Sequence, residues 1–134
     1  MSRRLAREGA YKLIFEYLFS KDRDGGSFDM VCCQDGMTQA DKEYLSKVYF
    51  GVVDNYDEIV RLISESTTGF NPDRYFKPDL AALLLAAYEM KYMPDIPTPV
   101  SISEVLELVK RYSTEGSASF VNGVLAGVDK KLKE

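Results

Sequence analysis

The stretch PDLAALLLAAYEMKY, residues 78–92, decides the fold class because it has no polar side between Asp79 and Glu89. Pro78 suits the first turn of a helix, where its missing backbone N–H would have no partner in any case. A helix that is apolar on every side lies in the centre of a core or under a partner. We therefore predict a central helix from Asp79 to Tyr92, around which the other elements pack.

Three helices are predicted before the central one, since apolar residues recur there at steps of three and four. The first is Arg3–Ser20, followed by Gly25–Gly26, which supplies the left-handed backbone that a helix end prefers. A short helix is predicted around Phe28–Gln34. A single long helix is predicted over Gln39–Ser66, opened by a capping-box variant at Thr38–Asp41.

Two helices are predicted after the central one, beyond a turn with prolines at positions 94, 97 and 99, which cannot continue a helix. Ser101–Glu104 has the pattern of a capping box and is predicted to open the next helix. Thr114 or Ser117 is the predicted cap of the last helix. The chain is therefore predicted to be all-α, with about six helices. Too few residues follow the proline turn for an independent core, so residues 1–134 are expected to form one domain.

Composition excludes several classes of protein. The 134 residues are 46% hydrophobic and 28% charged, which is ordinary for a globular chain, and histidine is absent, which removes the commonest general base and metal ligand. Cys32 and Cys33 are adjacent, which indicates a reducing compartment; they are interpreted as small apolar residues rather than a soft-metal pair. The longest uncharged apolar run, Leu80–Tyr88, is too short to cross a bilayer. We expect a soluble cytoplasmic protein without metal or cofactor.

Charge is distributed unevenly along the chain. Residues 1–12 carry a net charge of +3, and the remaining residues carry −7. Arg3, Arg7, Tyr11 and Phe15 lie at steps of four, on one ridge of the first helix, where they could neutralise phosphates and stack on unpaired bases. The alternative is that the two aromatic residues belong to the core and the arginines are only solvated. The acidic body argues against broad nucleic-acid binding and favours a second protein that contributes contacts.

Four stretches together resemble the NusB family of transcription antitermination factors. They are RRLARE at 3–8, PD through AYE at 78–89, DIPTPVSISEVLELVK at 95–110 and STEGSASFVNGVL at 113–125. The resemblance implies an all-α fold of two packed three-helix bundles and no enzymatic activity. It also implies binding to the boxA sequence of ribosomal RNA leaders together with NusE, a small-subunit ribosomal protein, within the RNA polymerase antitermination complex that reads through terminators.

The resemblance also implies site residues, in an arginine-rich start and in a second RNA-contacting region at the beginning of the last helix. The RNA-binding candidates are Arg3, Arg4, Arg7, Tyr11, Glu115, Ser117, Ser119, Phe120 and Asn122. Asp79 is the candidate for binding NusE, or else a helix-start carboxylate. Phe120 could equally belong to the core, and Asn122 could bond its own backbone. Leu80 and Leu84 stand where relatives usually carry arginines.

Three other interpretations compete with RNA-binding antitermination. The chain could be a helical interaction module that has lost RNA recognition, and it could form a homodimer that hides the RNA surface. Catalysis by carboxylates such as Glu104, Glu107 and Glu115 is the weakest alternative, because the first two are better interpreted as a cap and a solvated face. The sequence has no glycine-rich phosphate loop and no cluster of metal ligands.

Overall fold

The computed structural model describes residues 2–23, 27–68 and 71–134, and this part of the chain is all-α, as predicted. Its elements are α1 (Ser2–Ser20), α2 (Ser27–Cys32), α3 (Gln39–Asp54), α4 (Tyr56–Ser66), the 3-10 turn η1 (Pro72–Arg74), α5 (Lys77–Tyr92), α6 (Thr98–Tyr112) and α7 (Ser117–Leu132). None of the described helices is long and apolar enough to cross a membrane.

Helix α5 is the centre of the fold, as its sequence predicts. Every residue from Asp79 to Glu89 is buried, and α5 contacts α1, α3, α4, α6 and α7. Leu80 and Leu84 both belong to this core. The helix begins at Lys77, so Pro78 occupies its first turn without loss of a helical hydrogen bond.

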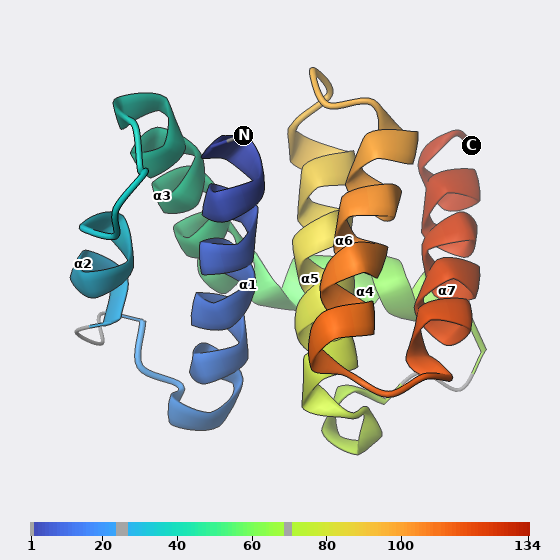
Figure 1. The fold of residues 1–134 in the computed structure, drawn as a ribbon. Coiled ribbons are helices and arrows are strands. Elements are labelled where there is room, and N and C mark those ends of the chain that lie inside the picture. The colour runs from blue at the N-terminus through green and yellow to red at the C-terminus, as the bar shows by residue number, and fades with distance from the viewer. Residues whose placement is uncertain (1, 24–26, 69–70) are drawn as a thin grey trace.

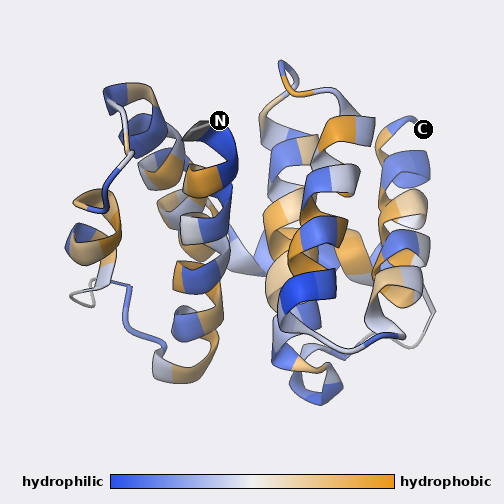
Figure 2. Ribbon diagram, in the orientation of Figure 1, coloured by the Kyte–Doolittle hydropathy of each residue, from blue (hydrophilic) through white to orange (hydrophobic). Residues whose placement is uncertain are grey.

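The helices form two groups on either side of the contact between α1 and α5 (Figure 1). Helices α1, α2 and α3 pack together in one group, and α5, α6 and α7 pack together in the other. Helix α4 packs against α5 and α7 and crosses behind them in this view. In Figure 2, α1 and α6 alternate between hydrophilic and hydrophobic residues, which is the pattern of helices with one buried side.

The predicted long helix over residues 39–66 is wrong, because the chain breaks at Asn55 into α3 and α4. The Asn55 amide Nδ2 donates to the Gly51 carbonyl at 2.8 Å, and the Asn55 backbone N–H donates to the same oxygen at 3.0 Å. Asparagine side chains compete in this way for backbone groups and end helices. The described residues therefore form seven α-helices, where we expected about six. The predicted Thr38 capping box at the start of α3 is confirmed.

Two predicted caps in the second half of the chain are also wrong. Helix α6 begins at Thr98 rather than Ser101, because Pro99 is compatible with a first turn, and Ser101 is fully buried. Helix α7 begins at Ser117 after Gly116 and has no side-chain cap.

The remaining boundaries lie in the first half of the chain. Helix α2 is shorter than predicted and ends at Cys32, which packs against the core, while Cys33 is exposed. Helix α1 ends at Ser20, where Lys21 has a left-handed backbone with φ of 57°. Its predicted terminators, Gly25 and Gly26, lie outside the described residues.

Two glycines of α7 should respond in opposite directions to replacement by alanine. A Cβ at Gly127 would lie 2.5 Å from the Ser66 carbonyl oxygen of α4, whereas a Cβ at Gly123 would meet nothing within 4 Å. We expect Gly127→Ala to lower the free energy of unfolding by about 1–3 kcal/mol through overpacking. Gly123→Ala should raise it by up to about 1 kcal/mol, because alanine favours helix. Urea unfolding of both variants checks the pair, and equal effects would contradict the close α4–α7 approach.

Candidate nucleic-acid interface

The predicted arginines of α1 divide into two exposed residues and one buried residue. Arg3 and Arg4 are exposed, whereas Arg7 is only 4% exposed. The Arg3 guanidinium lies 4.6 Å from the centre of the Tyr44 ring of α3, which is a cation–π contact. Arg3 and Arg4 therefore supply the cationic surface at this end of α1.

Arg4 is held by a carboxylate on α6. Its Nε and NH2 donate to the two carboxylate oxygens of Glu104 at 3.0 and 2.9 Å. This hydrogen bonding and the charge of Glu104 raise the pKa of Arg4, and the same hydrogen bonds hold the pKa of the Glu104 carboxyl below its usual range. The planar, two-point geometry is the one in which a guanidinium also binds phosphate.

Arg7 belongs to a buried polar network centred on Glu89, which is fully buried. Arg7 donates to Glu89 through Nε at 2.8 Å and through NH2 at 3.2 Å. Ser101 Oγ donates to the same carboxylate at 2.7 Å, and so does the Tyr44 hydroxyl. Burial opposes the charged form of Arg7, but the hydrogen bond and charge of Glu89 keep its pKa raised. The network joins α1, α3, α5 and α6.

Tyr11 is also buried, and its hydroxyl donates to the Pro78 carbonyl at 3.0 Å. Burial, and next the charge of Asp79, raise the pKa of this phenol. Tyr11 nevertheless contributes one wall of an apolar pocket of about 240 Å³ between α1 and the ends of α5 and α6. The other lining residues are Lys12, Phe15, Pro78 and Tyr112.

Asp79 lies beside this pocket, where it ties the start of α5 to the start of α7. Its carboxylate accepts hydrogen bonds from Ser113 Oγ at 2.6 Å and from Ser117 Oγ at 3.0 Å. The hydroxyls of Thr114 and Ser117 are 2.8 Å apart. Of the two predicted caps, Ser117 is thus a partner of Asp79 and Thr114 a partner of Ser117, and both Asp79 and Ser117 are buried.

The other predicted residues at the start of α7 face solvent. They are Glu115, Ser119, Phe120 and Asn122. Phe120 is 42% exposed and contacts the ring of Tyr75 edge-on, with ring centres 5.3 Å apart. An exposed aromatic ring beside hydroxyl and amide groups is a surface on which an unpaired base can stack.

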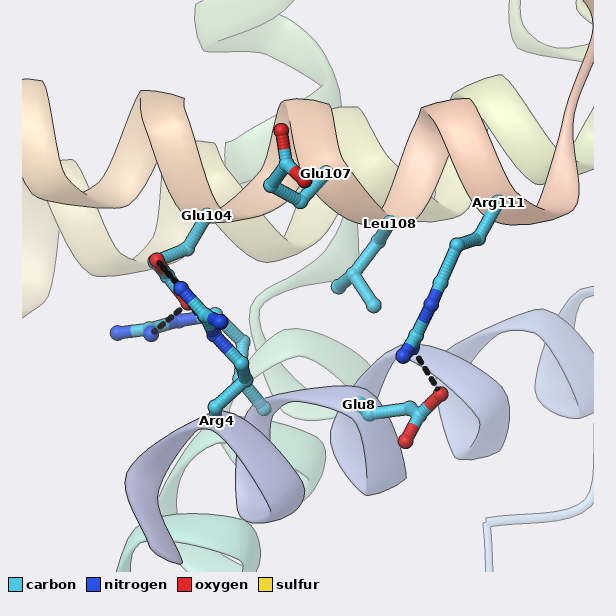
Figure 3. A pocket seen from close by; sticks show the side chains of 7 residues that line it. Arg4, Glu8, Glu104, Glu107, Leu108 and Arg111 are labelled. Atoms are coloured by element: carbon cyan, nitrogen blue, oxygen red, sulfur yellow. Dashed lines mark hydrogen bonds and ion pairs between the residues drawn. The ribbon is translucent and has the colours of Figure 1, made fainter. Parts of the chain in front are cut away.

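A narrow groove of about 70 Å³ separates α1 from α6, and two ion pairs with exposed arginines cross it, beside a 3.7 Å contact between the buried Arg7 NH1 and Glu104 Oε1 (Figure 3). One is the Arg4–Glu104 pair. In the other, Arg111 NH1 lies 2.6 Å from Glu8 Oε2, and the Tyr112 hydroxyl also donates to that oxygen. Burial alone would raise the pKa of the Glu8 carboxyl, but the Tyr112 hydrogen bond and the charges of Lys12 and Arg111 hold it below its usual range.

The structure therefore does not gather all the predicted residues in one place. The exposed arginines lie at the N-terminal end of α1, and the start of α7 lies at the opposite end of the molecule (Figure 1). Sequence reasoning missed the partners Glu89, Glu104 and Arg111. Only Glu89 carries a signal, because it follows an uninterrupted apolar run in which a carboxylate needs a buried cation.

Comparison with known proteins identifies the family. The NusB family matches residues 4–130. A transcription antitermination protein NusB from Acetivibrio thermocellus is 42% identical over 97% of this chain and 90% of its own length. The NusB protein of Finegoldia magna is 36% identical over 98% of this chain and 96% of its own length.

Solved structures agree with this match. The structure of T. maritima NusB has a TM-score of 0.86 and 31% identity, and the match covers 97% of this chain and 92% of that chain. A crystal structure of the antitermination factors NusB and NusE in complex with dsRNA has a TM-score of 0.85 and 25% identity, over 96% of both chains. This chain therefore belongs to the NusB family, whose proteins are transcription antitermination factors and not enzymes.

Proposed function

We propose that this protein binds boxA-type RNA of ribosomal RNA leaders together with NusE, acting in the cytoplasm as part of the RNA polymerase antitermination complex. The observation that carries the proposal is the exposed pair Arg3 and Arg4 on a chain whose remaining charge is acidic. So few cations give modest affinity for RNA alone, which favours a complex in which a second protein adds contacts. The solved NusB–NusE–RNA complex of a relative supports this arrangement.

The exposed residues are the proposed direct RNA contacts. Arg3 and Arg4 neutralise phosphates, while Phe120 stacks on a base and Ser119 and Asn122 supply hydrogen bonds beside it. Glu115 accepts a hydrogen bond from a base amino group or a ribose hydroxyl. The buried candidates Arg7, Tyr11 and Ser117 act from inside, by holding α1 and the start of α7 in position.

We infer that NusE docks at the apolar pocket between α1 and α5. Its aromatic walls offer the kind of surface that is enriched in protein interfaces. Asp79 directly follows Pro78, which lines the pocket. Its carboxylate accepts hydrogen bonds from Ser113 and Ser117, which hold this edge of the pocket in place. Asp79 thus serves NusE binding by shaping the pocket, since its own carboxylate is already bonded.

The whole chain is proposed to act as one domain. In this interpretation α1–α3 and α5–α7 are two three-helix bundles, and α4 is the connection that packs against the second. The buried Arg7–Glu89 pair spans the two bundles, so they should unfold together. A single transition seen alike by circular dichroism and by tyrosine fluorescence would support one domain; two transitions would contradict it.

The direct test is fluorescence anisotropy of a labelled boxA RNA, with and without NusE, at two salt concentrations. We expect salt-sensitive binding that NusE strengthens and that scrambled RNA does not reproduce. Capture of NusE with no RNA binding would instead support a pure interaction module. Sedimentation at several protein concentrations tests whether a homodimer competes with the RNA complex.

Arg3→Gln and Arg4→Gln should each weaken RNA binding severalfold. Each should also reduce the slope of log affinity against log salt by about 0.7, the value for one lost phosphate contact on a single strand. Anisotropy titrations across a salt series measure both quantities. Arg61→Gln, an exposed residue of α4 remote from this end of α1, is the matched control and should change neither. Unchanged slopes in both α1 variants would remove these arginines from the interface.

A further inference from the structure

The two ion pairs of the α1–α6 groove whose arginines are exposed have their cations on opposite helices. In the first, the cation Arg4 is on α1 and the carboxylate Glu104 is on α6. In the second, the carboxylate Glu8 is on α1 and the cation Arg111 is on α6. Figure 3 shows both pairs spanning the groove, with Leu108 between them.

In both pairs the cation faces solvent and the carboxylate is covered. The Arg4 side chain is 69% exposed against 19% for Glu104, and the Arg111 side chain is 54% exposed against 18% for Glu8. Three other ion pairs between distant segments of the described chain, all of them at the surface, have the opposite asymmetry. Their carboxylates, Asp54, Glu58 and Glu65, are each more exposed than their cationic partners. The exposed members of these two pairs are therefore cations on an otherwise acidic protein, and Glu107, an exposed carboxylate that also lines the groove, is paired with Lys110.

Further cations lie near Arg111. Lys12 is exposed on α1, and its Nζ lies 5.4 Å from the centre of the Tyr112 ring, while the Arg111 guanidinium lies 5.6 Å from the same centre. Lys110 is the exposed neighbour of Arg111 in the last turn of α6. Two cations around one exposed tyrosine ring can neutralise phosphates next to an aromatic surface.

The position of Arg111 lies between the two proposed RNA contacts. Arg111 is seven residues after Glu104 on α6, which corresponds to about 10 Å along the helix. Helix α6 ends one residue later, and the segment leading to the start of α7 follows. An RNA strand that touches Arg4 and then the start of α7 passes along this part of α6.

We propose that Arg111, together with Lys12, is a further RNA-binding site that contacts backbone phosphates between the N-terminal arginines and the start of α7. The inference rests on the proposed RNA-binding function and extends it to residues outside the two contact regions. In it, Glu8 is the internal counter-ion that a phosphate displaces. The competing role is purely structural, in which the Arg111–Glu8 pair only braces α1 against α6.

The two roles predict different changes in RNA affinity when Arg111 or Glu8 is replaced. If Arg111 binds phosphate, Arg111→Gln weakens boxA RNA binding by about threefold to tenfold and lowers the salt slope by about 0.7. Glu8→Gln then strengthens binding, because it frees Arg111 and removes a nearby negative charge. If the pair is only a brace, both variants weaken binding alike and neither changes the slope.

The experiment is anisotropy with boxA RNA and the full chain, with and without NusE, for wild type, Arg111→Gln, Glu8→Gln, Lys12→Gln and the control Arg61→Gln. Thermal unfolding first confirms that each variant is folded at the working temperature. We expect Lys12→Gln to weaken RNA binding as Arg111→Gln does, and Arg61→Gln to bind RNA like wild type. Wild-type binding that Arg111→Gln leaves unchanged would overturn this inference alone. Absence of wild-type binding would instead overturn the proposed function.

Discussion

Glu89→Ala should lower the free energy of unfolding by about 3–5 kcal/mol, because it leaves the Arg7 guanidinium buried without its carboxylate. The substitution also removes the acceptor of the Tyr44 and Ser101 hydroxyls. For a chain of this size the loss corresponds to a fall in melting temperature of roughly 10 °C or more. Calorimetry or circular dichroism measures it directly.

Glu107→Ala is the matched control for this prediction. Glu107 is an exposed glutamate that pairs with Lys110 on the same helix, so its removal should leave the melting temperature nearly unchanged. Equal melting temperatures for Glu89→Ala and wild type would show that the buried network contributes little to stability. The melting temperature of Glu89→Gln should fall between those of Glu89→Ala and wild type, since glutamine keeps the shape of the side chain but loses its charge.

Leu84→Ala should lower the free energy of unfolding by about 2–5 kcal/mol, the range for truncating a buried leucine. Leu84 is fully buried near the middle of α5, the helix that packs against both groups. Urea unfolding with a fixed m-value measures the change. Val100→Ala, which truncates an exposed residue of α6, should have little effect. A small loss at Leu84 would mean that the centre of the core collapses around the missing side chain.

The burial of Leu84 also bears on a departure from the family pattern. The resemblance to the family implies arginines where this chain has Leu80 and Leu84. Both leucines lie in the core. In this protein the two positions therefore contribute to packing, and the cationic surface has to come from elsewhere.

Sequence reasoning predicted the central helix because a helix that is buried on all sides has apolar residues at nearly every position. It missed the break at Asn55 because the buried apolar residues of α3 and α4 keep the same spacing of three and four residues across the break. It also placed the start of α6 too late, at Ser101, because it took the prolines at 97 and 99 only as helix terminators, although it accepted Pro78 in a first turn. In each case a local hydrogen bond or first-turn geometry decided the boundary, and hydrophobic periodicity does not record either.

The candidate site was less predictable than the fold. Helical spacing placed Arg3 and Arg7 on one ridge, but it could not show that one meets solvent and the other meets Glu89, 82 residues away. The partners of Arg4 and Glu8 are likewise about a hundred residues distant. Contacts of this range depend on the packing of α1 against α5 and α6, which no local pattern encodes.

The central position of α5 has a consequence for synthesis of the chain. Helices α1 and α3 pack against each other and also against α5, so the part of their docking surface that α5 supplies does not exist until residues 77–92 have left the ribosome. Up to that point the nascent chain exposes hydrophobic side chains that the finished protein covers, and long-range closure of this kind slows folding. The N-terminal arginines therefore reach their final positions only after more than half of the protein has been made.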